Sequence, residues 1–287
     1  MREDVPRPEI VYDLQETNYG VVEKPLTFRE RIYDNGLARK SLVLLLLICV
    51  WEIYAIYLDN PLLFPRFSET IKAFITGIAN GIIPERTWFS IKVLLQGYVI
   101  GLFCAGLLTA FAITTRIGND FLETLTATFN PLPAIALLPL AMVWFGLGTA
   151  SLVFVLVHSV LWAIALNTHS GFQGVSQTLR MVGRNYGLTG PRYVLNILVP
   201  AAFPSILTGM KIGWAFAWRT LIAAELVFGV SSGAGGLGWF IYENKNLLEI
   251  SNVFAGLFSV ILIGLIVENF FFRWIETKTV RRWGLQA

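Results

Sequence analysis

The chain is poor in charge and in cysteine. Only 14% of its 287 residues are charged, whereas 55% are hydrophobic, so there are too few polar side chains to cover a water-soluble globule of this size. The two cysteines, Cys49 and Cys104, both lie in apolar segments, which argues against a disulfide framework or a thiolate metal site. The low content of charged residues indicates that part of the chain's surface is in contact with lipid.

The sequence also lacks the short motifs of hydrolytic and metal chemistry. It contains no GxxxxGK[ST] phosphate loop and no HExxH pair, so we expect no catalytic residue and no ATP hydrolysis by this chain itself. Its two histidines, His158 and His169, lack a third ligand, and we expect no bound metal. Gly233, Gly235 and Gly238 match a dinucleotide-binding spacing, but no strand precedes them, and we interpret them as a glycine-rich external loop.

Six apolar segments are long enough to cross a bilayer, which takes about 20 helical residues. Because only a helix satisfies its own backbone hydrogen bonds in lipid, an all-α polytopic membrane fold is predicted. The expected spans are residues 41–58, 90–114, 121–144, 151–170, 205–228 and 251–272. They divide the chain into an N-terminal arm (1–40), a transmembrane domain (41–274) and a tail (275–287). Pro131, Pro133 and Pro139 are expected to kink or break the third span.

The basic residues set the expected orientation. Most lie in the N-terminal arm, the second and fourth connections and the tail, whereas the alternate connections hold only Arg66, Lys72, Arg86 and Lys245. Because basic residues accumulate on the cytoplasmic side, we expect both termini in the cytoplasm. The basic residues form no continuous face, which argues against nucleic acid as a partner.

The longest cytoplasmic connection, residues 171–204, is too polar to span a membrane. Its apolar residues recur at near-helical spacing between arginines. We therefore expect one or two short helices at the membrane surface.

Part of this connection, MVGRNYGLTGPRYVLNILVP (181–200), resembles the cytoplasmic loop of permeases of bacterial ABC importers. The family pattern is EAA, three residues, Gly, nine residues, a branched apolar residue, one residue, an apolar residue and Pro. Gly187, Ile197, Val199 and Pro200 fall at those spacings, while Met181, Val182 and Gly183 stand in place of EAA. Residues 130–148 and 200–226 are similar to the third and fifth helices of the taurine, sulfonate, nitrate and bicarbonate group of these permeases.

The resemblance implies a type I ABC importer permease with a coupling helix between helices 4 and 5. It also implies a bacterial inner-membrane homodimer with two ATPase subunits that bind ATP and Mg, a periplasmic solute-binding protein, surrounding lipid and no cofactor in this chain. The cargo would be a small anion, taurine or another sulfonate first, then nitrate or bicarbonate. The expected ATPase-coupling residues are Arg180, Met181, Val182, Gly183, Arg184, Gly187, Arg192 and Pro200. Alternatively, the arginines only follow the positive-inside rule or contact lipid headgroups.

The fifth span carries an unusual density of polar and aromatic residues. At about 100° per residue, Lys211, Trp214, Trp218 and Glu225 fall within an arc of roughly 60°, and Arg219 lies some 80° to one side of Lys211. Because intramembrane charges usually face a partner or a water-filled cavity, the five are candidates to line the translocation pathway. The alternative is that Lys211 reaches the cytoplasmic interface and Glu225 pairs with a neighbouring helix.

The competing function is a self-sufficient secondary transporter or channel. Such a protein would need its own ion-coupling carboxylates within the spans, and only Glu52, Glu225 and Glu268 are available. An intramembrane enzyme would need a nucleophile and a base, and no such pair stands out.

Overall fold

The computed structural model describes residues 34–228 and 235–282, and all regular elements within these ranges are helices. They are α2 (Gly36–Leu58), α3 (Phe67–Ala79), α4 (Ile82–Thr114), α5 (Arg116–Phe129), the 3₁₀ turn η1 (Ala134–Leu137), α6 (Leu138–Phe145), α7 (Thr149–Gln173), α8 (Gln177–Asn185), α9 (Gly190–Tyr193), the π-helical η2 (Val194–Leu198), α10 (Val199–Phe228), α11 (Leu237–Asn246), α12 (Ile250–Ile266), the π-helical η3 (Val267–Phe272) and α13 (Arg273–Lys278). Most of the expected N-terminal arm, Gly233 and the end of the tail lie outside the described residues.

The described chain divides into two compact units between Val50 and Trp51, within α2. In the first unit, the apolar side chains of residues 42–47 of α2 are exposed. A helix that is apolar and unburied over this length suits contact with lipid.

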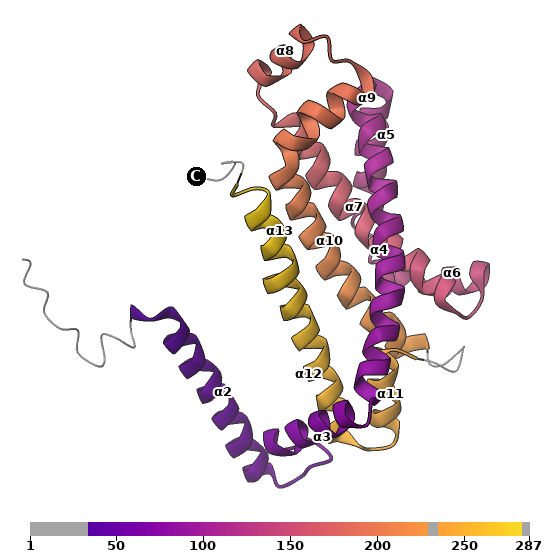
Figure 1. Ribbon diagram of the computed structural model, residues 1–287. Coiled ribbons are helices and arrows are strands. Elements are labelled where there is room, and N and C mark those ends of the chain that lie inside the picture. Colours follow the sequence, from indigo (N-terminus) through magenta and orange to yellow (C-terminus); the bar gives the residue numbers. More distant parts are fainter. Residues whose placement is uncertain (1–33, 229–234, 283–287) are drawn as a thin grey trace, which may run out of the picture. The chain divides into compact units, whose positions relative to one another are not determined.

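The core of the second unit forms where α4, α7 and α10 pack side by side (Figure 1). Leu94, Val155 and Leu221, one from each helix, are fully buried there. At Gly97 a Cβ atom would lie 2.5 Å from Leu156 Cβ, and at Gly101 one would lie 2.8 Å from Val160 Cβ. The two glycines of α4 therefore let its backbone approach α7 closely, as small residues do between helices in membranes.

The predicted third span is broken. α5 ends at Phe129, and after a turn containing Pro131 and Pro133 the helix resumes as η1 and α6 at an angle of 86°. Proline removes a backbone donor and fixes φ, and two prolines this close prevent α5 from continuing. Pro139 instead sits in the first turn of α6, where its missing N–H costs nothing.

Two helices begin several residues before the spans expected from the sequence. α4 begins at Ile82 rather than Ser90, and the fifth span begins at Val199 rather than Ser205, with helical structure already continuous from Gly190. α4 has 33 residues, so at 1.5 Å per residue it is longer than the roughly 30 Å hydrocarbon core, and its first turns, which hold Glu85, can extend beyond that core.

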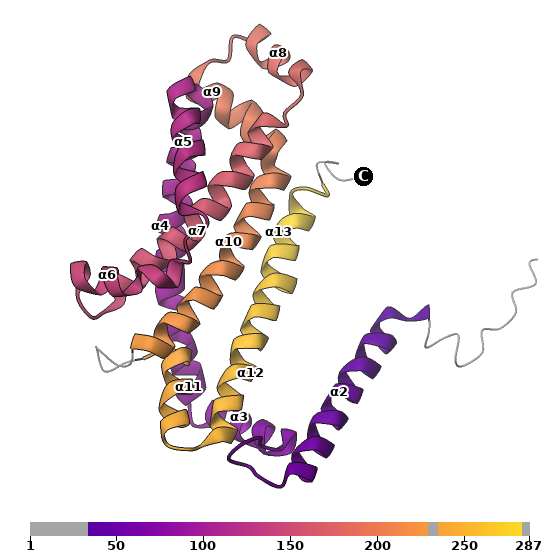
Figure 2. The same cartoon turned by 180° about the vertical axis from the view of Figure 1, so that it is seen from behind.

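The connecting helices gather at two opposite ends of the second unit. α8, α9, the start of α5 and the end of α13 lie at one end, and α3 and α11 lie at the other, in both views (Figures 1 and 2). By length and composition, five described helices can cross a membrane, or six if α5 and η1–α6 together form one span. The all-α polytopic fold with up to six spans is therefore confirmed.

Candidate functional site

The connection between α7 and α10 contains a short exposed helix, α8. Leu179, Val182 and Tyr186 share one face of α8 and are exposed, as is Met181 on another face. Ser176 caps the start of the helix, because its Oγ accepts a hydrogen bond from the Leu179 N–H. The predicted surface helix is therefore present, with apolar side chains turned outward.

Gly187 ends this helix in the left-handed conformation, at φ +71°. The Leu188 N–H donates to the Gly183 carbonyl at 3.1 Å and the Gly187 N–H donates to the Arg184 carbonyl at 2.9 Å. A left-handed glycine with these hydrogen bonds forms a Schellman-type helix end. The glycine of the loop pattern therefore serves to terminate α8. The turn directs the chain back into α9.

Gly183 brings α8 against the segment that enters α10. A Cβ atom here would lie 2.9 Å from Ile197 Cγ1 and 3.0 Å from a ring carbon of Tyr193. A larger residue would have to displace one of these neighbours. Gly183, at the third position of the family pattern, therefore permits close packing between α8 and the start of the fifth span.

The three arginines of this connection occupy different environments. Arg180 is partly buried, and its guanidinium donates to the carbonyls of Phe172 and Val175 at the end of α7. Arg184 and Arg192 are exposed and form no ion pair with the described residues. Arg180 thus ties α8 to α7, while the other two are available to a partner.

Pro200 lies in the first turn of α10, directly after the π-helical segment. The Val199 N–H donates to the Val194 carbonyl, five residues back, and Pro200 has no N–H to donate. The wider π turn therefore ends where the proline would otherwise interrupt the hydrogen-bond ladder. Pro200 is exposed, next to the groove between α8 and α10.

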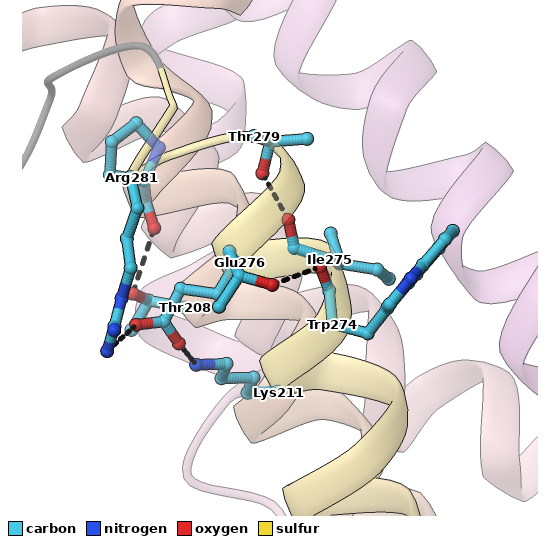
Figure 3. Close-up of polar contacts among 9 residues, drawn as sticks. Thr208, Lys211, Trp274, Ile275, Glu276, Thr279 and Arg281 are labelled. Carbon is cyan, nitrogen blue, oxygen red and sulfur yellow. Dashed lines mark hydrogen bonds and ion pairs between the residues drawn. The ribbon is translucent and has the colours of Figure 1, made fainter.

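On α10, Lys211 is paired with the last helix of the unit. Its Nζ lies 2.6 Å from Glu276 Oε2, and Glu276 Oε1 lies 3.8 Å from Arg281 Nη2. Figure 3 shows Glu276 between the two cations. Lys211 therefore joins α10 to α13 within one protomer.

The two tryptophans of the same stripe also have intramolecular contacts. Trp218 is buried, and its Nε1 donates to the Val260 carbonyl of α12 at 3.2 Å. The Trp214 ring lies edge-on to Tyr98 and Phe272, with centroids 5.5 and 6.2 Å away. Both rings thus fill the space between α10 and its neighbours α4, α12 and η3.

Glu225 is 3% exposed and joins three helices. Its carboxyl accepts from Ser90 Oγ of α4 at 2.8 and 2.9 Å and from the Gly238 N–H at 2.8 Å. Ser90 Oγ in turn accepts from the Leu237 N–H at 2.9 Å. The first two N–H groups of α11 are therefore capped by side chains from α4 and α10.

Arg219 lies on a different face of α10, where it borders a cavity of about 310 Å³. Its guanidinium carbon lies 5.7 Å from the centre of the Phe216 ring. Among the described residues no carboxylate forms an ion pair with it. The other lining residues include Asn130 and Ile135 from the break after α5, His158 and Trp162 from α7, and Thr220 from α10.

Sequence reasoning missed the residues that surround Arg219. The sequence draws attention to His158 only as a metal ligand that lacks partners, and it does not single out Trp162, four residues later on the same face of α7. The proline-rich break was the available signal, because a broken helix in a membrane commonly lines a cavity. Nothing in one sequence, however, indicates that the break lies beside Arg219.

Residues 97–282 match the family described as binding-protein-dependent transport system inner membrane component. The chain belongs to this family. The match covers the connection with α8, the Arg219 cavity and the spans that join them. The protein is therefore a multi-pass membrane permease, the membrane-spanning subunit of an ABC importer, and its family implies ATPase and solute-binding partners.

Named relatives cover most of the permease. A protein of Methanocaldococcus jannaschii described as an ABC transporter permease is 33% identical over 81% of this chain and 87% of its own length. The nitrate import permease protein NrtB of Synechocystis is 29% identical over 86% and 90%. The taurine transport system permease protein TauC of Escherichia coli is 26% identical over 76% and 80%.

Proposed function

We propose that the permease forms half of a translocation pathway for a small anion and that Arg219 faces this pathway. The observation that carries the proposal is an exposed arginine without a carboxylate partner among the described residues, beside a cavity in the spanning part of the chain. A lone intramembrane cation is costly unless it faces water or a counter-ion. A passing anion would supply that counter-ion.

The relatives support this class of cargo. NrtB is named for nitrate and TauC for taurine, and both compounds carry an oxyanion group. We place taurine or another sulfonate first, then nitrate or bicarbonate.

We further propose that α8 is the coupling helix and docks on a separate ATPase. Its exposed apolar residues, Leu179, Met181, Val182 and Tyr186, would enter a groove of the partner. Arg184 and Arg192 would pair with acidic groups around that groove, as exposed arginines at an interface rim can do.

The attachment of α8 suits a lever. Arg180 ties it to the end of α7, and the close approach at Gly183 packs it against the entry to α10. A displacement of α8 would therefore move two spans together rather than being lost in a loose loop. These are the spans that carry His158, Trp162 and Arg219 beside the cavity.

The proposed assembly is a homodimer of this permease with two ATPase subunits that bind ATP and Mg, a periplasmic solute-binding protein and surrounding lipid. Both termini would be cytoplasmic, with α8 on that side and α3 and α11 on the periplasmic side. Arg184 belongs to α8, Arg192 to α9, and Arg116 is the first residue of α5. α8, α9 and the start of α5 gather at one end of the second unit (Figure 1), which supports a cytoplasmic location for that end by the positive-inside rule. That Lys211, Trp214, Trp218 and Glu225 also line the pathway stays a prediction.

The test is an Arg219→Ala variant reconstituted in liposomes with its ATPase and binding protein. We expect loss of ATP-dependent anion uptake, with complex assembly and basal ATP hydrolysis retained. Arg273→Ala, which removes an exposed arginine of α13 away from the cavity, is the matched control and should keep uptake. Normal uptake by Arg219→Ala would remove Arg219 from the pathway, and uptake by the permease alone would identify a self-sufficient carrier.

A further inference from the structure

The turn between α11 and α12 has a leucine in the left-handed conformation. Leu248 has φ +60°. Its N–H donates to the Lys245 carbonyl at 3.2 Å, and the Glu249 N–H donates to the Asn244 carbonyl at 2.9 Å, which is the same Schellman arrangement that ends α8. In α8 the left-handed residue is Gly187, which adopts this conformation without steric cost. In α11 it is a bulky side chain, for which the conformation is disfavoured.

Packing within the protomer does not explain this leucine. Leu248 and the preceding Leu247 are each 63% exposed. At an exposed left-handed position glycine would make the more stable turn, and a leucine that stabilised the fold would be buried. Two adjacent exposed leucines in a turn, one of them in a disfavoured conformation, therefore indicate a contact with another molecule.

A pocket with an excess of carboxylates adjoins the two leucines. It has a volume of about 380 Å³ and is lined by Leu247 together with residues of α3, α4, α11 and α12. The charged groups of its lining are Glu85, Glu243 and Glu249 against one cation, Arg86. Arg86 lies 3.7 Å from Glu243, whereas Glu85 and Glu249 form no ion pair with the described residues. The pocket therefore favours a basic side chain.

The turn and the pocket lie at the end of the second unit opposite α8, in both views (Figures 1 and 2). We place this end on the periplasmic side, so the inference that follows rests on the proposed function. A small apolar surface beside carboxylates suits a protein partner with basic groups. The same carboxylates would be repelled by a lipid surface with anionic headgroups.

We propose that Leu247, Leu248 and this pocket form a docking surface for the solute-binding protein. The two leucines enter an apolar depression of that protein, and one of its lysine or arginine side chains occupies the pocket beside Glu85, Glu243 and Glu249. The family match implies such a partner, and the inference assigns the position and chemistry of its contact. Burial of the leucines supplies affinity, and the carboxylates speed association at low salt.

The experiment measures binding of the fluorescently labelled solute-binding protein to the full permease–ATPase complex in lipid nanodiscs. Leu248→Gly removes the side chain at a position where glycine suits the backbone. It should weaken binding at least about tenfold, because burial of one leucine contributes that factor. Leu107→Ala, which truncates an exposed leucine of α4, is the matched control and should bind as the wild type does.

A stability measurement separates docking from folding. The same Leu248→Gly variant is unfolded in mixed micelles by titration with sodium dodecyl sulfate. The midpoint concentration should be unchanged or higher than that of the wild type, because glycine removes the steric conflict at φ +60°. A residue that served the fold would give the opposite shift.

A further pair of variants tests the pocket. Glu249→Gln removes one negative charge from the lining and should slow association about threefold at low salt, with a smaller difference at high salt. Lys245→Gln, which changes an exposed charge of opposite sign on α11 outside the lining residues, is the control and should not slow association.

Four outcomes would overturn the docking surface. They are no saturable binding by the wild type, equal binding by Leu248→Gly and the wild type, a lower unfolding midpoint for Leu248→Gly, and equal association by Glu249→Gln and the wild type at low salt. Equal binding is also the result expected if the leucines contact lipid.

ATP-driven uptake of taurine is measured on the same complexes in liposomes with the binding protein, so the two proposals fail separately. Uptake by Leu248→Gly with the wild-type dependence on binding-protein concentration removes only the docking surface. Weakened binding by Leu248→Gly, in a complex whose wild type imports no anion, removes the proposed import and retains the surface.

Discussion

Because Glu225 caps the start of α11, the loss of stability on replacing it can be predicted. The carboxyl accepts from Gly238 N–H and from Ser90 Oγ, and it is 3% exposed. Replacing Glu225 with Ala removes both bonds and leaves the Gly238 N–H without a partner in a region closed to water.

The expected loss follows from the two bonds. A buried N–H left without an acceptor costs about 1–3 kcal/mol, and an interhelical hydrogen bond within a membrane contributes about 0.6 kcal/mol. Glu225→Ala should therefore lower the free energy of unfolding by about 2–4 kcal/mol. Glu225→Gln keeps one oxygen acceptor for Gly238 and should lower it by less than about 1 kcal/mol, close to the contribution of one ordinary hydrogen bond.

The assay is unfolding of the purified permease in mixed micelles, titrated with sodium dodecyl sulfate and followed by tryptophan fluorescence. Ser259→Ala is the matched control, since the one hydrogen bond that this buried serine makes within the described part of the chain goes to the Ala255 carbonyl of its own helix; it should shift the unfolding free energy by less than about 0.5 kcal/mol. The cap is refuted if Glu225→Ala is as stable as Ser259→Ala. A double-mutant cycle with Ser90→Ala should give a coupling energy of at least about 0.5 kcal/mol, because the two side chains share a bond.

Two glycine substitutions test the packing and the turn. Gly97→Ala places a Cβ 2.5 Å from Leu156 Cβ and should destabilise the permease by about 1–3 kcal/mol in the same titration, whereas Gly106→Ala meets no atom within 4 Å and should be neutral or stabilising by up to about 1 kcal/mol; equal effects would disprove close packing at Gly97. Gly187→Ala requires φ +71°, a conformation that costs a side chain about 1–2 kcal/mol, and should speed amide hydrogen exchange at the end of α8. Gly174→Ala, at φ −71°, should not, and identical exchange in both variants would contradict the left-handed turn.

Local signals in the sequence predicted the features that depend on few residues. The spacing of Gly187 in the loop pattern corresponds to a left-handed helix end, and Pro131 and Pro133 correspond to the broken span. Backbone conformation at such positions is set by the residue itself, so it can be inferred without knowing the neighbours. The same reasoning did not show that the helix of the second span begins at Ile82, because Glu85 and Arg86 are charged although they lie in the first turns of α4.

Partners that are distant in sequence could not be inferred. Lys211 meets Glu276 across 65 residues, and Glu225 meets Ser90 across 135. The helical arc correctly groups Lys211 and Glu225 on one face of α10, but periodicity does not indicate which neighbour that face contacts. Helical periodicity also places Arg219 on a different face of α10 from Lys211 and Glu225. In the structure, the face with Lys211 and Glu225 packs within the protomer, and the face with Arg219 borders a cavity.

The arrangement of contacts on α7 and α10 indicates how events at α8 would reach the cavity. Arg180 fixes α8 to the last carbonyls of α7, Gly183 fixes it to the entry of α10, and Ser159 and Thr220 join the same two spans at the cavity wall. The contact between α7 and α10 is also the most extensive of any pair of described elements, so a rotation of α8 would move them as a pair, whereas the broken span after α5 is held by fewer contacts. The wall contributed by η1 would then shift relative to Arg219, and the cavity would change shape without either span bending. In this scheme α8 would move α7 and α10 together relative to the broken span after α5. Such a movement requires α8 to be firmly attached to both helices, and the short, closely packed connection between α7 and α10 provides that attachment.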